Sequence, residues 1–259
     1  MSECGCVGET RTRTPTHRNS HTGAQFASRP RGPGYNADVS ALDAVPLFPL
    51  PNVVLFPRAV LPLHIFEERY KTMTADVLDG DRQVAMALLK PGWEKSYYGR
   101  PAIEPVVCVG TIPPTAWEKL ADGKYNFLLE GDTRAVIERE LPDTNKPYRI
   151  ARLRALEQVP VMEIDLGDVR QRLTQIFNEG AFAHTSTAKQ FRQMLSSPVP
   201  AIDVVCDLIA FNVLDDVNVK QSLLADVDVR ARIERTVEAL ADVQRMLGPA
   251  LRPDEVNLN

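Results

Sequence analysis

Residues 45–66 read VPLFPLPNVVLFPRAVLPLHIF, and this stretch decides how the rest of the chain is interpreted. Five prolines fall within residues 46–62, between large apolar side chains. Proline has no amide hydrogen to give to a β-ladder, so strands here must lie at sheet edges or bend repeatedly. An exposed strand edge is also where an extended peptide can add as a further strand. Both roles stay open, and the core is favoured for most individual apolar residues: Leu47, Leu50, Val54, Phe56, Leu61 and Leu63.

The whole chain has the composition of an ordinary globular protein. Its 259 residues are 44% hydrophobic and 25% charged, which suffices for a core without disulfides or metals. The net charge of −4 argues against a nucleic-acid-binding domain, which is usually basic. No run approaches the roughly 18 apolar residues of a membrane helix, and residues 1–40 contain no signal-peptide core. We therefore expect a cytoplasmic protein that does not bind membranes.

Residues 1–40 are predicted to be a disordered tail, because they contain few large apolar residues. Five arginines and three acids give this tail a charge of +2, whereas the remaining residues have a charge of −6. Cys4, Cys6, His17 and His21 are zinc-ligand types. However, the two cysteines are separated by a single residue, and the intervening sequence has no apolar residues to build a finger. No metal or cofactor is expected, and Cys108 and Cys206, in apolar runs, are predicted to be reduced.

Between residues 41 and 160 the chain consists of short apolar runs separated by Pro and Gly, which is typical of strands. Residues 134–138 and 148–153 alternate so that one face is polar, as in half-buried strands of a small barrel or curled sheet. Residues 66–78 have apolar side chains at helical spacing and predict a helix. Residues 121–124 (ADGK) predict a hairpin turn.

Between residues 161 and 248 the apolar period becomes that of a helix. Helices are predicted around residues 166–177, 188–195, 202–214 and 219–224. The clearest helix, over residues 229–247, has one apolar stripe and an opposite polar side, which includes Arg230, Arg232, Glu234, Arg235, Glu238 and Asp242. Residues 249–259 are predicted to fray.

Common catalytic motifs are missing from the sequence. It contains no Walker A loop, no GxSxG elbow and no HExxH pair. His64, in the run LPLHIF, is predicted to be a buried or half-buried residue bonded to backbone. A hydrolase that uses His64 with Glu67 or Glu68 is the less favoured alternative, because adjacent helical carboxylates do not face each other. We expect no enzymatic activity.

Five motifs, in order, resemble the N-terminal substrate-binding domain of the ATP-dependent protease Lon. The first is the run at residues 45–66, which is similar to the opening of that domain. Residues 107–112 (VCVGTI) resemble its VGT strand, and residues 122–135 resemble its "DG…L.EG..R" hairpin. Residues 148–153 and the KQSLL run at 220–224 are similar to its next strand and its helical part. The resemblance covers about residues 44–247.

This resemblance implies an α+β fold, with a PUA-like β-barrel subdomain over residues 41–160 and a helical subdomain over residues 161–248. It implies a module that binds unfolded or damaged client proteins in quality control, in some cases beside a separate Lon-type protease. The chain ends at Asn259, before the family's ATPase and Ser-Lys protease domains would begin, so a stand-alone, non-catalytic form is expected. The oligomeric state stays open.

Aromatic residues are the usual hot spots of protein interfaces. The peptide-binding candidates are Phe48, Phe56, Pro57, Phe66, Trp93, Tyr97 and Tyr98. The last three follow Pro91 and Gly92 in a loop-like stretch, where exposure is expected. RNA binding is the alternative function, because PUA-like barrels can recognise nucleic acid. It would require a basic face and salt-dependent affinity, and the acidic balance of the chain counts against it.

Overall fold

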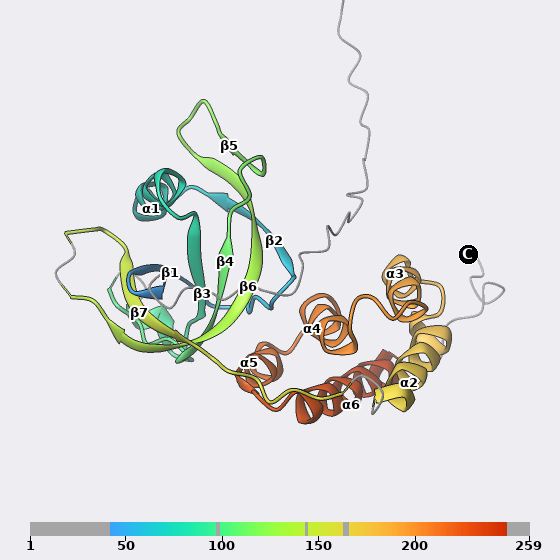
Figure 1. Cartoon of the computed structure of the whole chain (residues 1–259). Coiled ribbons are helices and arrows are strands. Elements are labelled where there is room, and N and C mark those ends of the chain that lie inside the picture. The colour runs from blue at the N-terminus through green and yellow to red at the C-terminus, as the bar shows by residue number, and fades with distance from the viewer. Residues whose placement is uncertain (1–41, 97–98, 143–144, 163–165, 248–259) are drawn as a thin grey trace, which may run out of the picture. The chain divides into compact units, whose positions relative to one another are not determined.

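The computed structural model describes residues 42–96, 99–142, 145–162 and 166–247 (Figure 1). The predicted tail with its cysteines and histidines, Tyr97, Tyr98 and residues 249–259 lie outside the described residues. Within the described part, the last strand ends at Ala155. Apart from α1 and short 3-10 turns, every helix there begins at Gly167 or later. The fold is therefore of the predicted α+β class.

The strands form one sheet. Their order is β2-β6-β4-β3-β1-β7, and β5 pairs with β6. The bounds are β1 Val45–Leu50, β2 Val60–Ile65, β3 Gln83–Leu88, β4 Val106–Thr111, β5 Trp117–Lys119, β6 Tyr125–Glu140 and β7 Arg149–Ala155. Strands β1 and β3 are parallel, whereas the other pairs are antiparallel. The long β6 also pairs with β7, so the path β6-β4-β3-β1-β7 returns to β6.

Strand β1 contains two prolines although it lies between β3 and β7. Pro46 lies opposite Ile150 of β7, and the Ile150 carbonyl accepts from the Leu141 N–H on the side away from β1. Two residues opposite each other that do not exchange hydrogen bonds both point their backbone groups outward, so the Pro46 nitrogen faces β3. Pairing with β3 begins only at Leu47. By the same alternation Pro49 turns its nitrogen toward β7, whose pairing has already ended at Leu47. Both missing donors therefore face unpaired positions, so of the two expected placements, a sheet edge or a bend, β1 does not occupy the edge.

The predicted hairpin and helices are confirmed, with shifted ends. Gly123 adopts a φ of 79° in the turn between β5 and β6. The helix expected over residues 66–78 begins only at Glu68, so Phe66 lies outside it. The helices are α1 Glu68–Asp79, α2 Gly167–Asn178, α3 Ser186–Leu195, α4 Ile202–Val213, α5 Val217–Ala225 and α6 Val229–Leu247. The Asp216 carboxylate caps α5 by accepting from the backbone N–H groups of Asn218 and Val219, which is the stabilising interaction expected at a helix start.

Three apolar clusters hold the described residues together. One is made mainly of side chains from the sheet strands and includes Leu47, Val107 and Ala151. A second packs α2, α3, α4 and α6 against one another. The third joins the two kinds of structure, because Leu223 and Leu224 of the helical part share it with strand residues such as Phe127. The burial of both Cys108 and Cys206 agrees with their predicted role as small apolar residues, and burial raises the pKa of both thiols.

A buried ionic network also connects β6 to the helices. The Asp207 carboxylate of α4 lies 2.6 Å from Nη2 of Arg134 in β6 and 3.3 Å from Nε of Arg232 in α6. Arg134 further donates to the Leu224 carbonyl, and Gln221 donates to the Val106 carbonyl. Burial raises the pKa of Asp207, and the two guanidinium groups oppose this rise.

The prediction that Arg134 and Arg232 lie on polar outer faces is wrong. Their side chains are 2% and 1% exposed. Both turn inward because one carboxylate from a distant helix neutralises part of their charge, and backbone carbonyls accept from both guanidinium groups. A buried charge without such partners would be very unfavourable.

Candidate functional site

The outer edge of β2 is the first feature that can bind a ligand. Strand β2 pairs with β6 on one side, with Pro62 opposite Leu128 and His64 opposite Asn126. The Leu128 N–H donates to the Ala116 carbonyl, on the side away from β2. In an antiparallel pair, the backbone N–H and C=O groups of successive residues point alternately toward and away from the partner strand. Val60, Pro62 and His64 therefore point these groups away from β6. No strand of the described residues pairs with that edge.

The edge offers a defined set of hydrogen-bonding groups. Val60 and His64 each present one N–H and one C=O, whereas Pro62 presents only its C=O. An extended segment can add here as a further strand, with one donor missing at the middle position. Proline at such a position is also a common protection against pairing between two copies of the same edge.

Beside this edge lie exposed apolar side chains on the outer face. The Phe66 side chain is 60% exposed and Leu128 is 42% exposed. Pro62, also exposed, lies across from Leu128 on the neighbouring strand. The ring centroid of Phe66 lies 6.2 Å from that of His64 in a stacked arrangement. The outer face therefore combines an available backbone edge with apolar surface.

A polar ladder crosses the same face. His64 Nδ1 lies 2.7 Å from Asn126 Oδ1, and Asn126 Nδ2 donates to Glu118 Oε1 at 2.6 Å. The prediction that His64 is buried or half-buried and bonded to backbone is wrong, because the register of β2 buries Ile65 and turns His64 outward, where it bonds to the Asn126 side chain. The ladder joins β2, β6 and β5 through side chains as well as backbone.

The other predicted binding residues occupy different environments. Phe48 and Phe56 are 5% and 0% exposed and belong to the core, so neither offers surface to a peptide in this conformation. Pro57 is half-buried in the turn before β2. Trp93 is half-buried in the short 3-10 helix Trp93–Ser96. The structure brings Phe66 to the β2 edge, and a binding role for any of these residues stays a prediction.

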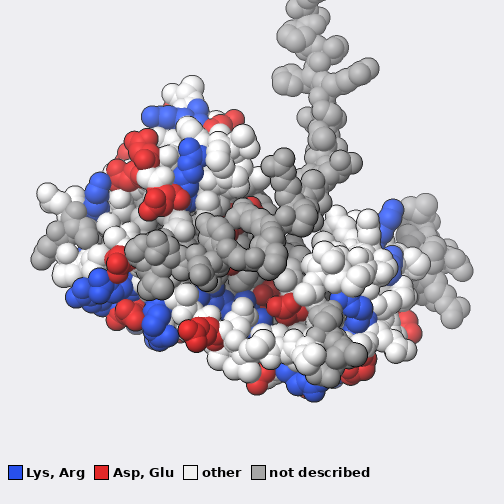
Figure 2. Space-filling model, in the orientation of Figure 1, with Lys and Arg blue, Asp and Glu red and all other residues white. Residues whose placement is uncertain are grey.

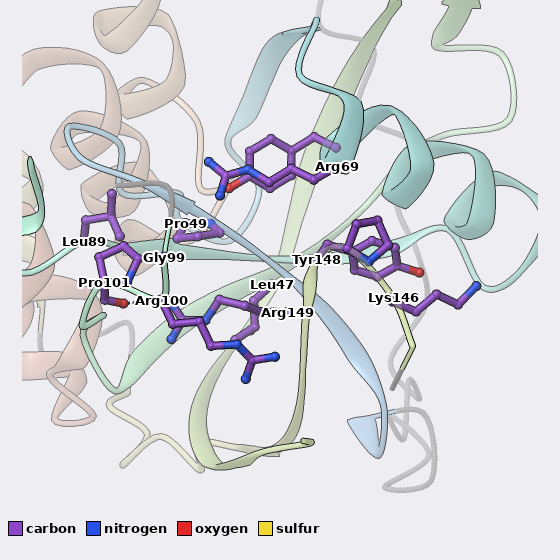
Figure 3. Close-up of a pocket in the computed structure, with 12 residues that line it drawn as sticks. Leu47, Pro49, Arg69, Leu89, Gly99, Arg100, Pro101, Lys146, Tyr148 and Arg149 are labelled. Carbon is purple, nitrogen blue, oxygen red and sulfur yellow. Dashed lines mark hydrogen bonds between the residues drawn. The ribbon is translucent and has the colours of Figure 1, made fainter. Parts of the chain in front are cut away.

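The second feature is a half-enclosed cavity of about 150 Å³ between β1, the start of α1 and the chain around β7. Figure 3 shows Arg69, Arg100, Lys146 and Arg149 around it, together with Tyr148 and apolar residues such as Pro49 and Leu89. Its lining contains four cations and no acid. The acids that pair with these cations are not among its lining residues, although Glu140 lines the adjoining depression.

Each of the four cations has an ion-pair partner; Arg69 lies 2.9 Å from Glu67, and Arg100 lies 3.9 Å from Glu140. Arg149 donates from Nε and Nη2 to the Glu140 carboxylate and from Nη1 to the Pro101 carbonyl. Lys146 Nζ lies 2.9 Å from Asp76, which also accepts from the Tyr148 hydroxyl at 2.6 Å. The Tyr148 hydrogen bond is the main cause that lowers the pKa of Asp76, and Lys146 adds to it. Burial, followed by the nearby Asp76 carboxylate, raises the pKa of Tyr148.

Sequence reasoning missed Leu128, Arg100 and Arg149. Leu128 sits in a run of apolar residues whose faces cannot be separated without the register of β6. The two arginines are far apart in the sequence, but in the fold both contact Glu140, and Arg149 donates to the carbonyl of Pro101, the residue next to Arg100. No group of three or more metal-ligand side chains occurs among the described residues, and no helix in the described ranges is long and apolar enough to cross a membrane.

A sheet with an available edge, exposed apolar side chains beside it and a positively lined cavity is the architecture of a binding module. The model of the ATP-dependent protease La (LON) substrate-binding domain matches residues 44–242. The chain therefore belongs to the LON substrate-binding domain family, and the resemblance inferred from the five motifs is confirmed.

Curated relatives are whole Lon proteases. The chain is 22% identical over 216 residues to Lon protease from Desulfosudis oleivorans, which covers 82% of this chain and 26% of that protein. It is 27% identical over 200 residues to Lon protease 1 from Syntrophobacter fumaroxidans, which covers 76% of this chain and 23% of that protein. The chain thus spans about a quarter of the length of these relatives.

Solved structures share the fold. The Lon N-terminal domain protein from Xanthomonas campestris is similar with a TM-score of 0.51 and 20% identity, over 75% of this chain and 97% of that chain. The N-terminal domain of Lon protease from the Mycobacterium avium complex has a TM-score of 0.60 and 12% identity, over 77% of this chain and 99% of that chain. At these identities the likeness concerns the fold alone.

Proposed function

We propose that the chain is a non-catalytic module that binds unfolded or exposed apolar segments of client proteins at the outer edge of β2. The observation that carries this proposal is the unpaired edge of β2 within the described residues, with the exposed Phe66 at its end. Membership of a substrate-binding domain family supports a protein ligand. A role in protein quality control, in the cytoplasm and beside a Lon-type protease, is part of the same proposal.

Binding by strand addition explains why such a module would accept many sequences. The backbone groups of Val60, Pro62 and His64 bond to the backbone of the client, which every sequence has. Alternate client side chains fall on the outer face, where they contact Pro62 and Phe66, and Leu128 lies one strand further along the sheet. Apolar client residues therefore add contact area without a precise sequence requirement.

Two finer features of the fold belong to the proposal. The hydrogen-bonded path that returns to β6 supports a PUA-like barrel over residues 41–160. The separate apolar cluster of α2, α3, α4 and α6 supports a helical subdomain over residues 161–248. The third cluster and the Asp207 network would then fix the helical subdomain against the barrel.

The alternative functions receive less support. On the face that Figure 2 shows, basic and acidic side chains are interspersed, and no continuous basic surface of the kind that binds RNA is visible. His64 is bonded to Asn126, while Glu67 and Glu68 form ion pairs with Arg69 and Lys71. These partners do not form the hydrogen-bonded pair of base and carboxylate that a hydrolase would need.

A binding measurement with substituted chains tests the proposal. The change in fluorescence anisotropy of fluorescein-labelled casein would be followed with the wild-type chain, Phe66→Ser, Pro62→Ala and the control Met246→Ser. Phe66→Ser should weaken binding about tenfold, as expected for loss of an interface aromatic. Pro62→Ala should tighten binding several-fold, because it restores a donor to the edge. Met246, 78% exposed on α6, is an apolar residue far along the chain from β2, and its removal should have no effect.

Two results would contradict this function. The first is no binding at tens of micromolar by a chain that circular dichroism shows to be folded. The second is equal affinity of the Phe66→Ser and Met246→Ser chains, which would place the client on another surface.

A further inference from the structure

The charges around the cavity between β1, β7 and α1 do not cancel. Arg69 pairs with Glu67, Lys146 with Asp76, and Arg149 with Glu140. Arg100 is the fourth cation, and its Nη1 lies 3.9 Å from the already paired Glu140 carboxylate. Among these groups, four cations and three carboxylates leave one positive charge in excess, and Arg100 makes the longest of the ion-pair contacts.

Arg100 is placed to use that charge on a ligand. Its side chain is 58% exposed, and within the described ranges the long contact with Glu140 is its one ion pair. The neighbouring Arg149 donates hydrogen bonds from Nε and Nη2 to the Glu140 carboxylate and from Nη1 to the Pro101 carbonyl. Arg149 thereby holds both Glu140 and the chain beside Arg100 in place, while the donors of Arg100 remain available for a planar anion.

An apolar depression continues from the cavity. It has a volume of about 570 Å³, is more open, and shares Arg100, Pro101 and Arg149 with the cavity. Its other walls are the apolar residues Ala102, Ile103, Pro105 and Ile137, together with Glu140, which is already paired with Arg149. An extended protein segment can lie along this depression and direct one residue into the cavity. A free inorganic anion would contact the cavity but would make no use of the apolar surface beside it.

We propose that the cavity binds a carboxylate of an apolar protein segment, with Arg100 as the residue that contacts it. A carboxylate accepts two parallel hydrogen bonds from a guanidinium group. Its single negative charge balances the single excess positive charge, whereas a phosphate group would bring up to two. The carboxylate can come from an acidic side chain or from a chain terminus, since both present the same group. This inference goes beyond strand addition, because the cavity shares no residue with β2.

Short labelled peptides test the inference. Fluorescein-labelled GAVLE with an amidated end provides a side-chain carboxylate, GAVLQ with a free end provides a terminal one, and amidated GAVLQ provides neither. At low ionic strength, we expect at least one of the first two to bind the wild-type chain about tenfold more tightly than amidated GAVLQ. Which of them does so identifies the source of the carboxylate.

Two arginine variants locate the carboxylate. Arg100→Gln should remove the tenfold preference. Arg154→Gln is the matched control, because Arg154 is an arginine of β7 with a similar exposure of 62% and a similar single contact, 3.2 Å from Glu138. The Phe66→Ser chain should keep the preference, so a failure of strand addition and a failure of this inference can be told apart.

Three outcomes would overturn the inference. Equal affinities for all three peptides would show that the carboxylate is not recognised. An equal loss in Arg100→Gln and Arg154→Gln would show general attraction by surface charge. Tighter binding of GAVL followed by an amidated phosphoserine than of both carboxylate peptides would show that the cavity prefers a dianion.

Discussion

Replacing Asp207 by Asn should destabilise the protein strongly. The substitution keeps the size of the side chain but removes the negative charge that pairs with both Arg134 and Arg232. In the wild-type chain the Asp207 carboxylate lies 2.6 Å and 3.3 Å from these two guanidinium groups. All three side chains are at most 6% exposed, so water cannot replace the lost charge. Breaking such a buried pair costs about 3–5 kcal/mol, a large part of the roughly 5–15 kcal/mol that stabilises a typical domain.

Urea denaturation followed by far-UV circular dichroism would measure this loss. Asp242→Asn is the control, because Asp242 pairs with Arg245 on α6, where the two side chains are 58% and 77% exposed. An exposed pair contributes at most about 1 kcal/mol. The free energy of unfolding should therefore fall at least threefold more in Asp207→Asn than in Asp242→Asn. A loss below about 1 kcal/mol in Asp207→Asn would refute the view that this carboxylate is what keeps the two arginines inside.

Two further changes address the backbone and the cavity. A Cβ on Gly131 would lie 2.1 Å from the Phe56 carbonyl oxygen, so thermal unfolding should show a loss of about 3 kcal/mol or more in Gly131→Ala. Gly123→Ala has space around its Cβ but a φ of 79°, and its loss should be smaller; equal losses would contradict the close approach at Gly131. Tyr148→Phe should lower the urea midpoint at pH 7, because the Tyr148 hydroxyl lowers the pKa of Asp76. A carboxylate with a lowered pKa stabilises the folded state above its unfolded pKa, and this stabilisation disappears as the pH falls through the folded pKa. The difference between Tyr148→Phe and wild type should therefore shrink as the pH falls below the ordinary Asp pKa of about 3.9, and a difference that stays constant as acid is added would assign it to packing instead.

Most elements of the fold could be predicted because their signals are local. The hairpin at residues 121–124 follows from Asp-Gly chemistry, and the stripe of α6 follows from a 3.6-residue period. The inward positions of Arg134 and Arg232 could not be predicted in this way. Each becomes favourable only when Asp207, 73 positions from Arg134, arrives from another element. A local sequence pattern predicts that an arginine is exposed, because charged side chains are almost never fully buried unless they are paired.

The candidate site was predictable only in part, for a related reason. Phe48, Phe56 and Phe66 are alike in sequence, each in an apolar run beside a proline or a strand end. Their exposures are 5%, 0% and 60%, and they differ because Phe48 lies within β1, Phe56 in the connection between β1 and β2, and Phe66 directly after β2. In a strand, a shift of one residue exchanges the buried and exposed faces. The register of β2 on β6 is therefore what selects Phe66 for the surface, and a single sequence does not contain that register.

On the proposed function, the register also sets how tightly the β2 edge would hold a client. The edge presents two N–H groups and three C=O groups, from Val60, Pro62 and His64. At about 0.5–1.5 kcal/mol net for each hydrogen bond, these contribute only a few kcal/mol, and association itself costs at least about 4 kcal/mol. Backbone pairing alone is therefore too weak to retain a client. The exposed Phe66 and Leu128 must supply the remainder, so affinity rises with the apolar content of the segment while its exact order matters little. If clients bind there as proposed, such an edge would distinguish an unfolded chain, which exposes such segments, from a folded one, which buries them.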